Sequence, residues 1–141
     1  MQPKTFYIGF KGLIVKDNKV LVLKNTDQFG KYFWDIPGGR MGEGEEIQQT
    51  LIRELTEEIP TIKDIHILDF VHVYRLPQNL QDGNGLTLLF YKVEAVIDTV
   101  KISDEHAEYR WVGKSDLESL NNDETYISNG YKKAIELALR I

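Results

Sequence analysis

Four glutamates and one arginine are spaced along residues 45–58 in a pattern that could hold a divalent metal ion. They are Glu45, Arg53, Glu54, Glu57 and Glu58. Carboxylates three and four residues apart on a helix repel each other unless a cation lies between them. Carboxylate oxygens are ligands that Mg²⁺ and Mn²⁺ prefer, and the chain has no cysteine to favour a softer metal. The spacing therefore indicates metal-assisted chemistry at this segment.

The segment that carries these residues has the periodicity of a helix. Ile47, Leu51 and Leu55 recur every four residues, which predicts a face turned toward a core. At about 100° per residue, Glu54 and Glu58 project to the same side as this apolar stripe. The acidic residues at positions 43, 45 and 46 are expected in the first turn, where the helix dipole favours negative charge. A solvated acidic helix face is the alternative interpretation of the glutamates.

Together with the preceding glycines, the segment resembles the Nudix box. That motif reads Gly, five residues, Glu, seven residues, Arg-Glu, an aliphatic residue, any residue, Glu-Glu, any residue, Gly and an aliphatic residue. Every charged position of the motif is met between Gly39 and Glu58. The resemblance implies a metal-dependent hydrolase that cleaves a pyrophosphate bond in a nucleoside diphosphate linked to another group. It also implies an α+β fold layered α/β/α, with a mixed sheet between helices over nearly the whole chain.

The resemblance assigns roles to the charged residues of the box. Glu54 matches a glutamate that binds metal and serves as a candidate base, and Glu57 and Glu58 match the other metal carboxylates. Arg53 matches the arginine that orients the catalytic glutamate, whereas Glu45 matches a glutamate with a largely structural part. The cofactor implied is Mg²⁺ or Mn²⁺, which would lower the pKa of an attacking water.

The glycines of the box have roles in the same resemblance. Gly38 and Gly39 belong to its structural part, and the carbonyl of Gly38 or Gly39 often completes the metal shell. Arg40 follows the two glycines and is expected to face substrate phosphates, with a solvated loop arginine as the alternative.

Two positions at the end of the box depart from the motif. Pro60 replaces the usual glycine, and Thr61 replaces the aliphatic residue after it. Proline cannot adopt the left-handed conformation with which glycine caps a helix, and it disfavours helical geometry at Ile59. The helix is therefore expected to end near Glu58 by a different turn. The metal carboxylates precede this point, so the departure bears on the loop that follows.

A further acidic candidate lies outside the box, in the Ser-Asp-Glu-His-Ala-Glu segment 103–108. Many Nudix enzymes have a glutamate in this loop that binds metal or acts as general base. Glu105 therefore joins Glu54 as a candidate catalytic base, with Glu108 behind it. An exposed acidic loop is the alternative. The three histidines form no close-spaced pair, and none is expected to bind metal.

Composition favours one globular domain over residues 1–141. Hydrophobic residues make up 42% and charged residues 28%, and the net charge of -5 argues against general nucleic-acid binding. There is no run of about 18 apolar residues, so no membrane span is expected. The absence of cysteine and of an apolar start favours a cytoplasmic protein. The resemblance implies that it acts on a small nucleotide, and the protein is expected to be a monomer or homodimer.

Alternating apolar residues and turn signals place the other elements. Residues 32–36 are expected to form an aromatic strand that ends in a turn at 37–39, and Ser115 is expected to cap a short helix. The other expected elements are a hairpin of 5–16 and 19–24, strands 65–74, 86–97 and 108–112, the short helix 116–120 and a terminal helix 126–139.

The substrate is the least constrained prediction. The compact chain resembles the nucleoside triphosphate pyrophosphatases, so a nucleoside triphosphate is the first expectation. Pro77 resembles a marker of the ADP-ribose pyrophosphatases, which leaves ADP-ribose or another nucleotide sugar as an alternative. Residues 32–34 could stack a base, although Trp34 is expected to pack under the turn instead. A catalytically weak nucleotide-binding or sensing module is an alternative of another class, against which the intact charged positions argue.

Overall fold

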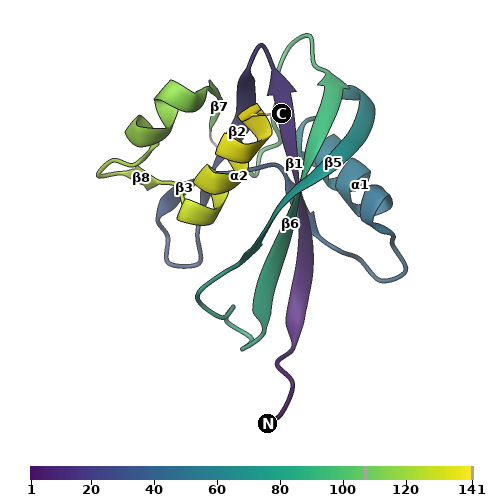
Figure 1. The fold of residues 1–141 in the computed structure, drawn as a ribbon, viewed down its shortest axis with the longest axis vertical. Helices are drawn as coiled ribbons and strands as arrows, with labels where there is room; N and C mark the ends of the chain where they lie inside the picture. The colour runs from purple at the N-terminus through teal and green to yellow at the C-terminus, as the bar shows by residue number, and fades with distance from the viewer. Residues whose placement is uncertain (107, 141) are drawn as a thin grey trace.

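The fold is α+β, with a mixed sheet between two helices, as the sequence predicts. The computed structural model describes residues 1–106 and 108–140. Figure 1 shows α1 and α2 on opposite sides of the sheet. In chain order the elements are β1 (Phe6–Lys16), β2 (Lys19–Thr26), β3 (Tyr32–Asp35), β4 (Gly38–Arg40), α1 (Ile47–Glu58), β5 (Lys63–Arg75), β6 (Gly85–Val96), β7 (Glu108–Val112), the 3₁₀ helix η1 (Lys114–Leu120), β8 (Thr125–Tyr126) and α2 (Asn129–Arg140).

Strand β1 organises the sheet, whose order is β5-β6-β1-β2-β3-β8, with β4 paired to β1 and β7 paired to β2. It runs parallel to β6 and antiparallel to β2 and β4. The pairing with β4 sets Phe10 opposite Gly39 and Lys11 opposite Gly38. The two glycines of the box are thus held against the central strand, beside α1.

Two apolar clusters fill the layers on either side of the sheet. Leu51, Leu55 and Ile59 are fully buried under α1, as the stripe predicts for the first two. The other cluster is covered by α2 and includes Trp34, which is 2% exposed. The expectation that Ile47 joins the core is wrong. It is the first residue of α1 and is 37% exposed, since the buried cluster does not extend to that end of the helix.

The box helix begins later in the chain than the sequence predicts, but it ends at the predicted residue, Glu58. Because α1 starts at Ile47, none of the acidic residues at 43, 45 and 46 lies in its first turn, contrary to expectation. Glu46 is the N-cap residue, and its backbone N–H donates to Gln49 Oε1 at 2.8 Å. At the other end, Ile59 has φ −128° and ψ 82°, so the helix stops after Glu58 without a left-handed residue.

Three other boundary predictions are wrong. Residues 38–40 form a strand and not only a turn, because they pair with β1. The short helix is capped by Gly113, whose N–H donates to Asp116 Oδ2 at 2.7 Å, and Ser115 lies inside it. The terminal helix starts at Asn129, because Tyr126 belongs to a strand pair with β3. Among the described residues, no helix is long and apolar enough to cross a membrane.

Candidate active site

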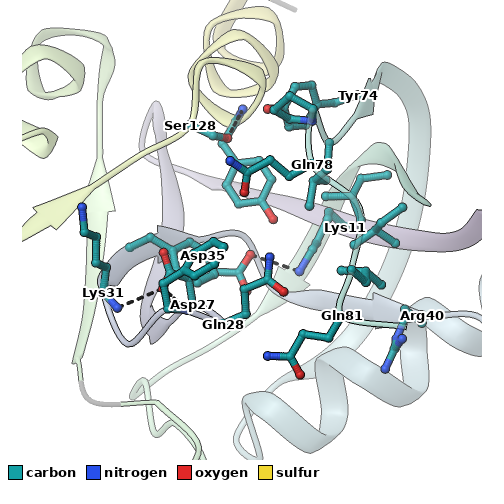
Figure 2. A pocket seen from close by; sticks show the side chains of 18 of the residues that line it. Lys11, Asp27, Gln28, Lys31, Asp35, Arg40, Tyr74, Gln78, Gln81 and Ser128 are labelled. Carbon is teal, nitrogen blue, oxygen red and sulfur yellow. Dashed lines mark hydrogen bonds and ion pairs between the residues drawn. The ribbon is translucent and has the colours of Figure 1, made fainter. Parts of the chain in front are cut away.

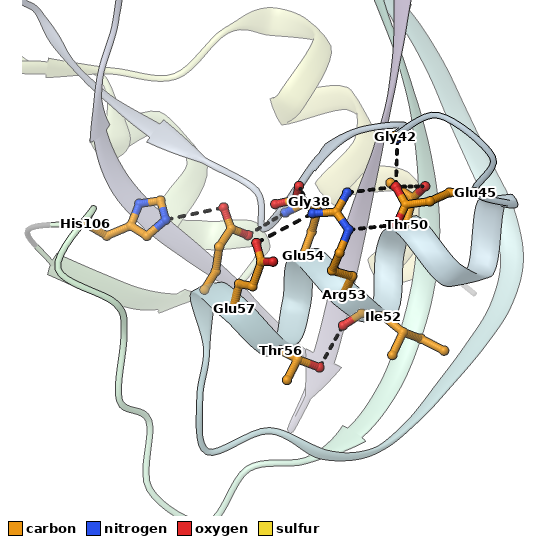
Figure 3. A network of polar contacts seen from close by, with 11 residues as sticks. Gly38, Gly42, Glu45, Thr50, Ile52, Arg53, Glu54, Thr56, Glu57 and His106 are labelled. Carbon is orange, nitrogen blue, oxygen red and sulfur yellow. Dashed lines mark hydrogen bonds and ion pairs between the residues drawn. The ribbon is translucent and has the colours of Figure 1, made fainter.

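Glu45 and Arg53 form a clamp between the loop and the helix of the box (Figure 3). Arg53 donates from Nε to Glu45 Oε2 at 2.7 Å and from Nη2 to Oε1 at 2.8 Å. Oε1 also accepts from the Gly42 N–H at 2.7 Å and from Thr50 Oγ1 at 3.1 Å. The hydrogen bond from Arg53 is the main reason that the pKa of Glu45 falls to about 2. Glu45 therefore fixes the guanidinium of Arg53.

The fixed guanidinium reaches the next carboxylate, Glu54. Arg53 Nη1 donates to Glu54 Oε1 at 2.8 Å and lies 3.6 Å from Glu57 Oε2. Burial raises the pKa of Glu54, Arg53 opposes that rise, and the negative charges of Glu58 and Glu57 add to it. The outcome is a partly buried carboxylate with a raised pKa, which is a stronger base than an exposed one.

Glu58 lies deeper, between the glycine strand and a histidine that the sequence did not single out. Glu58 is 7% exposed, and its Oε2 accepts from the Gly38 N–H at 2.7 Å. Its Oε1 lies 3.3 Å from His106 Nε2. Burial lowers the pKa of His106, but the contact with Glu58 and the negative charges of Asp35 and Glu105 together outweigh it, so the net direction is upward. Neither ring nitrogen has an aligned hydrogen bond within the described residues, so the contact with Glu58 is an ion pair when His106 is protonated.

The other two acidic candidates lie farther out. The Glu57 side chain is 60% exposed, and Glu105 is exposed in the turn before His106. Within the described part of the chain, no three Asp, Glu or His side chains converge closely enough to hold an ion as they stand. The structure thus brings Glu54 and Glu58 against residues 38–39, and leaves Glu57 and Glu105 at the edge of the site.

The donors on α1 and β4 nevertheless fit a hard divalent cation. They are carboxylate and carbonyl oxygens, the ligands suited to Mg²⁺ and Mn²⁺. Gly39 leaves room for them, because a Cβ there would lie 2.3 Å from the Glu54 carboxyl carbon. The like charges that help to raise the pKa of Glu54 would be relieved by a cation.

A cavity of about 1210 Å³ borders β4 (Figure 2). Gly39 and Arg40 line it, so it reaches the strand against which Glu54 packs. Arg40 is exposed, and its guanidinium carbon stands 4.6 Å from the Tyr7 ring centroid. Phe33 also lines the cavity, whereas Trp34 is buried in the core beside it, as predicted.

Comparison with known proteins agrees with this geometry. A family model described as NUDIX domain matches residues 8–133. An RNA pyrophosphohydrolase of Pelagibacter ubique is 32% identical over 127 residues, covering 79% of this chain and 77% of the relative. An ADP-ribose pyrophosphatase of Methanocaldococcus jannaschii is 26% identical over 129 residues, covering 89% and 73%. The crystal structure of a MutT protein from Methanosarcina mazei shares the fold, with a TM-score of 0.76 at 21% identity over 99% and 97% of the two chains. The chain therefore belongs to the Nudix family of hydrolases.

Proposed function

We propose that the protein hydrolyses a phosphoanhydride bond of nucleoside triphosphates, with Mg²⁺ or Mn²⁺ as cofactor. The position of Gly39 carries the proposal. This residue lines the 1210 Å³ cavity and touches the Glu54 carboxylate. A nucleoside held in the cavity would therefore direct its phosphates toward the glutamates of α1. The cavity is large enough for a nucleotide, since pockets for small ligands are typically about 300–1,000 Å³.

The metal would be held by Glu54, Glu57 and Glu58, together with the Gly39 carbonyl. It would lower the pKa of an attacking water and stabilise charge on the phosphate oxygens. Glu58 is already placed by the Gly38 N–H, but Glu57 has to turn inward from its exposed position. Arg53 is in contact with both Glu54 and Glu57, so it can guide that movement and orient Glu54.

Two residues compete for the role of general base. Glu54 has the raised pKa and lies next to the cavity strand, which favours it. Glu105 is exposed, but its loop neighbour His106 is in contact with Glu58, so the loop is anchored at the site. We assign the base to Glu54, and we expect Glu105 to act on metal or water only when substrate is bound.

Arg40 is the proposed phosphate contact. It lies in the cavity wall one residue after Gly39, and its side chain rests on Tyr7. Tyr7 is itself held by a hydrogen bond from its hydroxyl to Asp82 Oδ2 at 2.5 Å. A guanidinium held in this way can turn to a phosphate with little loss of side-chain freedom.

ADP-ribose is the second candidate substrate, because Pro77 lines the same cavity. The two relatives are named for different substrates, and neither name decides which substrate this protein hydrolyses. Nucleoside triphosphates remain our first choice because Gly39, which touches the Glu54 carboxylate, and Arg40 are neighbours in the cavity wall, where a chain of phosphates could contact both.

The deciding experiment is a hydrolysis screen with Mg²⁺ and with Mn²⁺, in ¹⁸O-labelled water, with products identified by mass. The panel includes nucleoside triphosphates, ADP-ribose, dinucleoside polyphosphates, NADH and RNA with a 5′-triphosphate. We expect a nucleoside monophosphate and pyrophosphate from triphosphates, with the label in one of them. Turnover of ADP-ribose at least about tenfold faster than of any triphosphate would overturn the proposal in favour of the second candidate.

A further inference from the structure

A buried lysine, Lys11, lies in the wall of the cavity. It is 7% exposed, and its Nζ is 3.0 Å from Asp35 Oδ1. Both residues line the cavity, and Figure 2 shows the contact between them as a dashed line. An ammonium group has three N–H donors, and this is the one hydrogen bond that Lys11 makes within the described residues. Two donors of a nearly buried cation are therefore available to a ligand.

The carboxylate that pairs with Lys11 has other donors of its own. Asp35 Oδ1 also accepts from the Ile36 N–H at 2.8 Å, and the Tyr131 side chain makes a further hydrogen bond to Asp35. The negative charge is thus shared among three donors, and hydrogen bonds of this kind stabilise a buried carboxylate. Asp35 therefore holds Lys11 in place without using up its donors.

Lys11 shares one face of the strand pair β1–β4 with Arg40. In that pair Lys11 stands opposite Gly38, and Arg40 stands opposite Gly9. Paired residues, and residues two apart along a strand, lie on the same face of a sheet. The two cations are therefore diagonal neighbours, a spacing that long side chains can bridge, and both line the cavity. The other two corners are Gly9 and Gly38, so no side chain of this strand pair separates the cations.

We propose that Lys11 is a second phosphate contact, which forms with Arg40 a cradle for the phosphate chain of the substrate; this rests on the proposed function. A lysine acts on phosphate oxygens as a point charge, and a guanidinium can bind two oxygens at once. Gly39 precedes Arg40 in the cavity wall and touches the Glu54 carboxylate, so a phosphate in the cradle lies beside the proposed metal site. A contact that binds substrate and transition state alike lowers KM and leaves kcat unchanged.

The test is the double variant Lys11→Met/Asp35→Asn. It removes both charges of the buried pair, whereas Lys11→Met alone would leave a buried carboxylate without its cation and endanger the fold. We expect the double variant to fold and to raise KM of the best substrate by at least about tenfold, as for the loss of a charged hydrogen bond. Its kcat should stay within about threefold of the wild type. A wild-type KM in the folded double variant would overturn the inference, because Lys11 would then serve only to pair with Asp35.

Two single variants assign the effect to Lys11. Asp35→Asn keeps the lysine and removes the opposing charge, so KM should be unchanged or lower. A rise in KM as large as that of the double variant would contradict the role of Lys11. Lys31→Met is the matched control, because Lys31 lines the same cavity but is exposed and lies outside the strand pair. It changes the net charge by the same amount as Lys11→Met, and its KM should stay within about threefold of the wild type.

Binding without turnover separates this inference from the proposed function. Calorimetry without metal compares ADP with adenosine, so the ratio of their affinities measures what the phosphates contribute. This ratio should fall by at least about tenfold in the double variant, even if the protein cleaves no triphosphate. An unchanged ratio would defeat the inference even if triphosphates are cleaved as proposed.

Discussion

The Glu54 carboxylate lies directly on the backbone of Gly39. A Cβ at Gly39 would stand 2.3 Å from the carboxyl carbon and 2.5 and 2.6 Å from its two oxygens, closer than such contacts allow. The neighbouring glycine is required for another reason as well, because Gly38 has φ +147° and a Cβ there would lie 2.0 Å from the Phe10 carbonyl oxygen. Position 39 therefore requires glycine because any side chain would collide with the Glu54 carboxylate, and replacing Gly39 tests whether Glu54 must lie there.

Replacing Gly39 with alanine should displace Glu54 and lower turnover strongly. A shift of about 1 Å in a catalytic group can cost on the order of a hundredfold, so we expect kcat to fall by at least about tenfold. The measurement is steady-state turnover of the best substrate, with thermal unfolding to confirm the fold. Gly113→Ala is the matched control, since a Cβ there meets nothing nearer than 3.5 Å. Wild-type turnover in Gly39→Ala would show that Glu54 need not occupy this position.

Removing the metal should abolish activity. Excess chelator should stop turnover, and Mg²⁺ or Mn²⁺ added above the chelator should restore it, because the proposed mechanism needs the metal to lower the pKa of the attacking water. Metal should also raise the melting temperature of the protein, since it binds the folded state. Full turnover in excess chelator would exclude the proposed role of Glu54, Glu57 and Glu58.

Neutralising Glu54 should separate catalysis from stability. Glu54→Gln should lower kcat by at least about a hundredfold, as expected for the loss of an acid–base group. The pKa of Glu54 is raised above its usual 4.5, so its ionisation costs folding stability once the pH exceeds that value. The metal-free variant should therefore melt at the same or a higher temperature than the wild type at pH 7, and this difference should vanish below about pH 4.5. Glu58→Gln should show the same loss of turnover.

Glu45 should show the opposite dependence on pH. Its pKa is lowered from 4.5 to about 2, chiefly by Arg53, so its charge stabilises the fold above pH 4.5 and that stability is lost as the pH falls toward 2. Thermal melts of the wild type and of Glu45→Gln between pH 2 and pH 7 would measure it. The two curves should converge at the acid end. Parallel curves over the whole range would show that the clamp between Glu45 and Arg53 contributes nothing to stability.

The local pattern of the box was predictable because it depends on contacts within one helix. Leu51 and Leu55 pack as their spacing indicates, and the arrest of α1 at Glu58 follows from Pro60. The prediction that Ile47 is buried was wrong because the periodicity of a helix does not indicate where the core ends. Its exposure depends on how far the sheet extends beneath α1.

Contacts between distant segments were not predictable. His106 lies 48 positions after Glu58, and nothing in its neighbourhood signals that its ring lies 3.3 Å from that carboxylate. The pairing of Lys11 in β1 with Asp35 in β3 depends on the registers of both strands against β2, which the sequence does not specify. The sequence pattern predicts that Tyr126 begins the terminal helix, but in the structure it pairs with β3, because strand pairing overrides local propensity.

A tight turn follows the box helix and contains Pro60. Ile59 N–H donates to the Leu55 carbonyl at 2.9 Å, and Ile62 N–H donates to the Ile59 carbonyl at 2.9 Å, so residues 59–62 form a tight turn with Pro60 in its second position. Proline is favoured there because its φ is already that of the turn.

Replacing Pro60 with glycine should therefore change stability little. Glycine could restore a left-handed cap but enlarges the unfolded ensemble, and these effects oppose each other at about 0.5–1 kcal/mol each. Pro60→Ala is the control, because it loses the proline constraint without offering the cap. Mn²⁺ affinity should hold in both variants, since Leu51 and Leu55 anchor the helix before the turn. A change of about tenfold or more in that affinity, measured by titration, would mean that Pro60 shapes the metal site itself.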